Sequence, residues 1–124
     1  MVPERKSHDN YMRLFTLSDV VLDSYPFSGG NTTYQAIAMG VPVVTYPGRY
    51  LRGRFSTATF ERMGMSELVA GDMAEFADIA LRLGTDDGYR REIRNRRAQT
   101  SDAIFDDPVY LAAIERFLMT AAPR

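Results

Sequence analysis

The chain has 124 residues, a net charge of −1 and no cysteine, with 45% hydrophobic and 25% charged residues. This is the composition of a globular protein in water, and the length fits one domain, so we expect residues 1–124 to form a single domain. The balanced charge argues against a nucleic-acid partner, and one histidine without cysteine argues against a transition-metal site. No apolar run could span a bilayer or form a signal peptide, so we predict no membrane partner and a cytoplasmic location.

The first two elements expected along the chain are a helix and a strand. Residues 7–17 place their apolar side chains on one helical face, and Ser7 or Asp9 can act as the N-cap. Residues 19–23, with the sequence DVVLD, are short, β-branched and apolar in the middle. This pattern favours a strand that is buried on both faces of a parallel sheet.

A glycine-containing turn and a second helix follow. The sequence SYPFSGG over residues 24–30 cannot continue a strand. Asn31 or Thr32 can then cap a helix that runs to about Met39 and ends at Gly40.

The middle of the chain predicts a second strand and a short helix. Residues 42–46, PVVTY, form another apolar, β-branched run that predicts a buried strand. A loop over 47–54 leads into a helix over 55–63 with Gly64 at its end. Residues 66–70 fit either a brief third strand or a turn.

Three helices are expected in the last part of the chain. Asp72 caps a helix with one apolar face, made of Met73, Phe76, Ala77, Ala80 and Leu83. A more polar helix runs from Asp86 or Asp87 to about Ser101, and we expect its arginines to form a solvated face: Arg90, Arg91, Arg94, Arg96 and Arg97. Pro108 suits the first turn of a last helix, for which we predict four side chains pointing inward: Leu111, Ile114, Phe117 and Leu118.

The alternation of strands and helices predicts the α/β class with a parallel sheet. Only two strands are clearly indicated, whereas a doubly wound sheet normally has five or six. We therefore expect a partial Rossmann-like parallel sheet with flanking helices, the carboxyl half of a larger domain.

The turn at residues 24–30 has the features of an anion-binding loop. It would lie at the carboxyl end of a strand, where open α/β sheets bind their ligands. Gly29 and Gly30 let the backbone approach a ligand closely, and the following helix would direct free N–H groups into the loop. The hydroxyls of Thr32 and Thr33 could add hydrogen bonds to a phosphate. The alternative is an ordinary strand-to-helix turn, which uses the same residue types.

Several segments together resemble the donor-binding half of GT-B glycosyltransferases. They are SDVVLDSYPFSGGNTTYQAIAMGVPVVTYPG, LRGRFSTATFERMGMSELVA and FADIALRLGTDDGYRREIR. The sequence is most similar to the O-linked N-acetylglucosamine transferase family, glycosyltransferase family 41, over about residues 8–110. The resemblance implies the carboxyl half of a GT-B donor lobe, without a bound metal or other cofactor. It also implies that Gly29, Gly30, Asn31, Thr32 and Thr33 face the diphosphate of a sugar nucleotide.

The resemblance implies further contacts at other positions. Family members usually have an acidic residue on the phosphate-facing helix that binds the ribose, and an ungapped match places Gln35 there. Tyr11 matches a position near the nucleobase, although a core tyrosine fits the same helix. His8 is expected to be a surface or capping residue, with base contact as the alternative. Arg54 could contact a phosphate, or belong to a solvated basic loop with its neighbours Arg49 and Arg52.

From this resemblance we expect the donor-binding segment of an inverting glycosyltransferase that moves a sugar from a UDP-N-acetylglucosamine-like donor to a protein hydroxyl. No catalytic residue is assigned within the chain, because the family's acceptor-contacting groups lie in the other lobe. We expect the isolated chain to be inactive, because it would lack the acceptor lobe and the first half of the donor lobe. We also expect it to self-associate, since a half-sheet leaves an edge and an apolar face uncovered. The alternatives are a non-catalytic ligand-binding or scaffolding module derived from such a lobe, favoured by Gln35, and a sugar-nucleotide epimerase.

Overall fold

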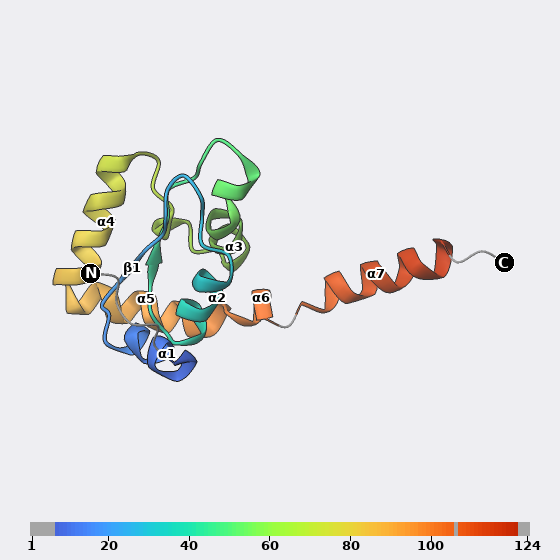
Figure 1. Ribbon diagram of the computed structural model, residues 1–124, viewed down its shortest axis with the longest axis horizontal. Helices are drawn as coiled ribbons and strands as arrows, with labels where there is room; N and C mark the ends of the chain where they lie inside the picture. The colour runs from blue at the N-terminus through green and yellow to red at the C-terminus, as the bar shows by residue number, and fades with distance from the viewer. Residues whose placement is uncertain (1–6, 106, 122–124) are drawn as a thin grey trace.

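The computed structural model describes residues 7–105 and 107–121, and it confirms the α/β class with a parallel strand pair (Figure 1). Most of the described residues are helical. Within this part of the chain, no helix is long and apolar enough to cross a membrane. In chain order the elements are α1 (His8–Thr16), β1 (Val21–Leu22), α2 (Asn31–Ala38), β2 (Val43–Val44), η1 (Leu51–Gly53), α3 (Phe55–Met63), η2 (Ser66–Leu68), α4 (Met73–Thr85), α5 (Asp87–Thr100), α6 (Asp102–Phe105) and α7 (Pro108–Ala121).

The two strands pair in parallel, with Val21 opposite Val43. The segment 66–70, expected as a brief strand or a turn, has features of both. It begins with the 3₁₀ turn η2 and then makes one isolated parallel bridge, between Thr45 and Val69. β1 therefore pairs with β2, and the residue after β2 makes a single bridge to the segment 66–70. This is the partial parallel sheet that the sequence predicts.

The two strands differ in burial. Val43 and Val44 of β2 are almost completely buried, as predicted for a strand covered on both faces. The same prediction is wrong for β1, where Leu22 is 58% exposed. Because β1 lies at the edge of the described sheet, it has a strand neighbour on one side only.

Local signals set the ends of α1, α3, α4 and α5 where the sequence predicts them. The prediction for α2 is wrong, because its N-cap is Gly30, without a side-chain cap, and not Asn31 or Thr32. The Ser7 hydroxyl caps α1 by accepting a hydrogen bond from the Asn10 N–H at 3.3 Å. Asp72 caps α4 in the same way, and Asp86 caps α5. Gly64 ends α3 in the left-handed conformation, with φ of 66°, which glycine adopts without the steric strain of a Cβ atom.

The core lies between the strands and the helices around them, and both α2 and α4 contact β2. The predicted apolar face of α4 is only partly correct. Leu83 is fully buried, and Phe76 and Ala80 are half-buried, whereas Met73 and Ala77 are exposed. The buried cluster draws on β2, η2 and helices α1 to α5 or their flanks: Phe15, Ala36, Ile37, Val41, Val43, Phe60, Met63, Met65, Leu68, Leu83 and Ile93.

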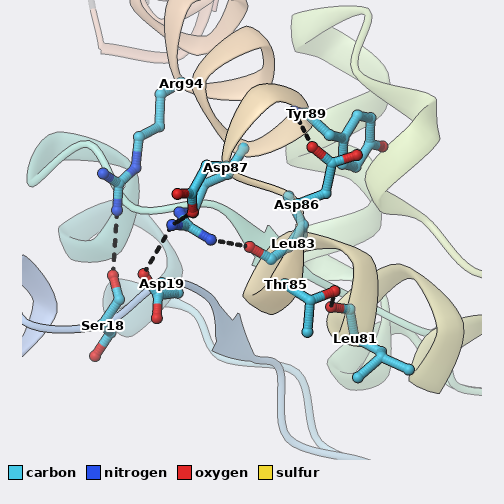
Figure 2. A network of polar contacts seen from close by, with 10 residues as sticks. Ser18, Asp19, Leu81, Leu83, Thr85, Asp86, Asp87, Tyr89 and Arg94 are labelled. Atoms are coloured by element: carbon cyan, nitrogen blue, oxygen red, sulfur yellow. Dashed lines mark hydrogen bonds and ion pairs between the residues drawn. The ribbon is translucent and has the colours of Figure 1, made fainter.

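The arginines of α5 do not form the solvated face that the sequence led us to expect. Four of them donate to main-chain carbonyls outside α5: Arg90 to Leu83, Arg94 to Ser18, Arg96 to Gly64 and Arg97 to Ile37. Figure 2 shows Arg94 reaching across to Ser18, at the start of the segment that leads into β1. Arg90 also pairs with Asp19 at 3.4 Å. The guanidinium groups thus tie α5 to the rest of the molecule, and of the five only Arg91 is exposed.

The expectation for the last helix is wrong in its packing. Figure 1 shows α7 extending away from the other elements, toward the C-terminus. Every residue of α7 is exposed, including the four predicted to point inward: Leu111 (61%), Ile114 (38%), Phe117 (67%) and Leu118 (58%). The helix forms as predicted, but within the described residues no element covers its apolar side chains.

Candidate functional site

The loop between β1 and α2 is organised around the carboxylate of Asp23. This residue directly follows β1, and its two oxygens accept four hydrogen bonds. Oδ1 accepts from the N–H groups of Ser24 at 3.0 Å and Gly29 at 2.7 Å. Oδ2 accepts from the hydroxyls of Ser28 at 2.8 Å and Thr45 at 2.7 Å. Since Thr45 directly follows β2, the carboxylate joins the carboxyl ends of both strands.

A chain of hydroxyl groups continues from this carboxylate to the starts of α2 and α3. The hydroxyl oxygens of Ser28 and Ser56 lie 2.8 Å apart, and those of Ser56 and Thr33 lie 2.7 Å apart. The Ser56 N–H also donates to the Ser28 hydroxyl at 3.0 Å. All three side chains are almost fully buried. The first turns of the two helices are therefore fixed to the same loop.

This arrangement separates the five residues expected to face a diphosphate into two groups. The N–H of Gly29 is used by Asp23, and the Thr33 hydroxyl donates to the Gly29 carbonyl. A hydroxyl has only one proton, so Thr33 has none left for a phosphate oxygen. The N–H groups of Gly30, Asn31 and Thr32 have no acceptor among the described residues. These three groups, at the positive end of the α2 dipole, are the donors that the loop leaves available.

A second loop packs tightly against the first. Gly53 lies so close to residues 26 and 48 that a Cβ atom there would be 2.5 Å from the Pro26 carbonyl oxygen. The Ser28 N–H donates to the Arg52 carbonyl at 3.0 Å across the same contact. Only glycine at position 53 allows the two backbones to approach so closely.

The arginines of this second loop differ in their surroundings. The guanidinium groups of Arg49 and Arg52 lie over the ring of Tyr50, with 5.7 Å and 4.7 Å to its centroid. Arg54 is exposed at the N-cap of α3, two residues before Ser56. Arg54 is therefore anchored through its neighbours to the loop that carries the free N–H groups.

The remaining candidate residues lie on α1 and α2. Figure 1 shows α1 near the end at which β1 begins, whereas the loop of residues 24–30 leaves the other end. His8 is exposed on α1, and Tyr11 packs on the core cluster with its ring edge-on to Phe15, 5.3 Å between centroids. Gln35 is half-buried on α2, one turn beyond Asn31 and on the same side of the helix. Gln35 is thus on the helix that starts at the loop, whereas His8 and Tyr11 are on α1, the helix that precedes β1.

A cavity of about 620 Å³ opens beside the first turn of α2. Gly30 and Asn31 form part of its wall, together with residues of α3, α6 and the start of α7. The other lining residues are Tyr34, Phe55, Ala58, Thr59, Arg62, Ala103, Ile104, Phe105, Asp107, Tyr110 and Leu111, of which Arg62 and Asp107 form an ion pair. The free N–H groups therefore lie next to a space that is large enough for part of a ligand.

The residues that shape this loop, namely Asp23, Ser28, Thr45 and Ser56, were not predicted from the sequence. An acidic residue at the carboxyl end of a predicted strand was the available signal for Asp23. The two serines and the threonine carry no signal of their own, because Ser28 and Ser56 are 28 residues apart and Thr45 is 22 residues from Asp23. No three His, Asp or Glu side chains among the described residues lie close enough together to hold a metal ion.

Comparisons with known proteins agree with the predicted family. The sequence profile of Glycosyl transferase family 41 matches residues 3–114. A UDP-N-acetylglucosamine–peptide N-acetylglucosaminyltransferase of Caenorhabditis elegans is 36% identical over 113 residues, which cover 89% of this chain and 10% of that protein. A probable enzyme of the same name, SPINDLY, from Hordeum vulgare is 33% identical over 88 residues, covering 71% of this chain and 9% of that protein.

A solved structure gives the same result. A mutant O-GlcNAc transferase of Thermobaculum terrenum superposes with a TM-score of 0.81 and 32% sequence identity, covering 93% of this chain and 22% of that chain. The chain spans about a tenth of the length of the two curated relatives. The fold is therefore that of one part of a larger catalytic protein, and the family predicted from the sequence motifs is confirmed. The chain belongs to glycosyl transferase family 41.

Proposed function

We propose that this chain is the donor-binding segment of an inverting glycosyltransferase, with the diphosphate of a UDP-N-acetylglucosamine-like sugar nucleotide bound at the start of α2. One observation carries the proposal. In a chain of family 41, the N–H groups of Gly30, Asn31 and Thr32 have no internal acceptor among the described residues, and Gly30 and Asn31 line a cavity beside the carboxyl end of the parallel strands. The related proteins named above use UDP-N-acetylglucosamine by their names, and this supports a donor of that class.

The chemistry follows from where negative charge develops. In the proposed reaction, a protein hydroxyl attacks the anomeric carbon of the sugar while the bond to the diphosphate breaks, so the leaving UDP gains charge. N–H donors that are already oriented stabilise this charge without reorganising. Arg54 would add a cation at the same edge, and Gln35 would contact the ribose with an uncharged amide. Thr33 and Gly29 would hold the turn rather than touch the ligand.

The main-chain donor can be tested with a proline substitution. Asn31 is the first residue of α2, where proline is tolerated, and Asn31→Pro removes the N–H together with the side chain. A charge-assisted hydrogen bond contributes about 1.5–3 kcal/mol, so Asn31→Pro should weaken UDP binding about tenfold or more in calorimetric titration. Asn31→Ala is the matched control, because it removes the side chain and keeps the N–H. Equal UDP affinities for the proline variant and the wild type would contradict the proposal.

The same titration separates the enzyme segment from a scaffolding module. A folded chain that binds neither UDP nor UDP-N-acetylglucosamine would favour a module that has lost its ligand. We also propose that the 124-residue chain does not transfer sugar by itself, since it spans about a tenth of the length of its curated relatives. Glycosylation of a peptide by the purified chain would contradict this part.

We further propose that the isolated chain pairs with a second copy. The edge residue Leu22 is 58% exposed, and α7 presents a row of exposed apolar side chains. Unpaired strand edges and large apolar surfaces favour association. Light scattering should therefore give a mass above that of the monomer, and a strictly monomeric folded species would refute the pairing.

A further inference from the structure

The Asp23 carboxylate is in an unusual position for an acidic group, because it lies beside a proposed anion site. Asp23 is half-buried, and all four of its hydrogen bonds hold it against the inside of the loop. The negative charge of the carboxylate is therefore stabilised by four hydrogen-bond donors within the protein. The residues that face outward, from Gly30 to Thr32, are uncharged.

The turn at Gly29 is closely fitted to this carboxylate. A Cβ atom on Gly29 would lie 3.2 Å from Asp23 Oδ1 and 3.2 Å from Thr33 Oγ1. The Gly29 N–H points inward to Asp23, and the Gly29 carbonyl accepts from both Thr33 and Ser56. With both polar groups of Gly29 used internally, the next three N–H groups are left at the start of α2 without internal acceptors among the described residues.

We propose that Asp23 is a positioning residue for the donor diphosphate. By holding Gly29 from one oxygen and Ser28 from the other, it fixes the direction of the Gly30, Asn31 and Thr32 N–H groups before the ligand arrives. This inference rests on the proposed function, because it names the residue that prepares the same site. It adds that binding depends on an acid that never touches the sugar nucleotide.

The chemistry predicts a graded response to substitution. Asp23→Ala leaves four donors without their acceptor, so the turn should open. Asp23→Asn keeps one oxygen for the Gly29 and Ser24 N–H groups, but it presents an amide N–H₂ to the hydroxyls of Ser28 and Thr45. A hydroxyl can accept as well as donate, so the asparagine variant should retain part of the loop structure. Aspartate is preferred because it accepts on both sides.

The experiment uses the whole 124-residue chain and titrates UDP by calorimetry, with unfolding in urea measured in parallel. We expect Asp23→Ala to weaken UDP binding by about tenfold or more. An opened turn would misplace the N–H donors to the diphosphate, and one charge-assisted hydrogen bond is worth at least that factor. The UDP affinity of Asp23→Asn should lie between those of Asp23→Ala and the wild type. Asp19→Asn is the matched control, since Asp19 also flanks β1 but pairs with Arg90. The control should bind UDP as the wild type does.

A second readout separates positioning from general stabilisation. Amide NMR shifts of Gly29 and Gly30 should move in the Asp23 variants while those of α4 and α5 remain. If Asp23→Ala does not fold, Asp23→Asn and Ser28→Ala decide the result. Folded Asp23 variants with a UDP affinity within about twofold of the wild type would overturn the proposal. A wild-type chain that does not bind UDP would instead overturn the proposed function, and unchanged loop amides would then overturn the role of Asp23 separately.

Discussion

The close contact between the two loops gives a prediction whose size can be worked out from the structure. A Cβ atom on Gly53 would lie 2.5 Å from the Pro26 carbonyl oxygen and 2.9 Å from Gly48 Cα. Both atoms belong to the backbone, so no side chain can rotate away. Gly53→Ala must therefore push the two loops apart, and it would strain the 2.7 Å hydrogen bond from the Gly48 N–H to the Gly53 carbonyl. Such overpacking typically destabilises a protein by about 1–3 kcal/mol.

This loss would be measured by urea unfolding of the variant and the wild type. Gly84→Ala provides the control, because Gly84 lies within α4 and a Cβ atom added there would meet no heavy atom within 4 Å. At this position the same substitution should raise the unfolding free energy by about 0.5–1 kcal/mol, since alanine favours the helix. The two variants should thus change in opposite directions. If Gly53→Ala were as stable as the wild type, the close backbone approach inferred from the structure would be wrong.

Three more predictions concern the core and α5. Leu83→Ala should lower the unfolding free energy by about 2–5 kcal/mol, because Leu83 is fully buried, and a loss below about 1 kcal/mol would contradict that burial. Arg97→Met should lower it by about 1–2 kcal/mol, since Arg97 donates to the Ile37 carbonyl at 3.0 Å, whereas Arg91→Met on the surface should change it little. Burial raises the pKa of Tyr89 above its usual 10.0, with the nearby Arg82 opposing the shift. The folded state therefore holds the phenol proton more tightly than the unfolded state, so the unfolding free energy should fall as pH rises above about 10. Urea titrations on both sides of that pH should show a smaller fall in unfolding free energy for Tyr89→Phe than for the wild type. An identical fall in the two proteins would contradict the raised pKa of Tyr89.

The ends of α1, α3, α4 and α5, together with β2, could be predicted from the sequence because their causes are local. The Asp72 side chain accepts from the N–H groups of Ala74 and Glu75, two and three residues away. Gly64 ends α3 through its own backbone conformation. The apolar run of β2 is short and fully buried, so its composition alone identifies it. A pattern within a few residues is sufficient in each case.

The internal structure of the candidate site could not be predicted in this way. The glycines and threonines at the start of α2 are site candidates on residue type and position. The division between residues that hold the turn and residues that face outward depends on Asp23, Thr45 and Ser56, which meet only after folding. The arginines of α5 show the same limit. Their charge predicts a solvent-exposed face, yet Arg97 donates to the carbonyl of Ile37, 60 residues away in the chain.

The last helix shows what an amphipathic pattern does and does not determine. The spacing of Ile114 and Phe117 predicts a helix with an apolar face, and the helix is present. The pattern indicates that covering this face lowers the free energy, but it does not identify the surface that covers it. Within the described residues no element does so, and Phe117 remains 67% exposed. The error in the predicted packing of α7 therefore supports the proposed association with a second copy, because the same side chains that fail to enter this core still favour removal from water.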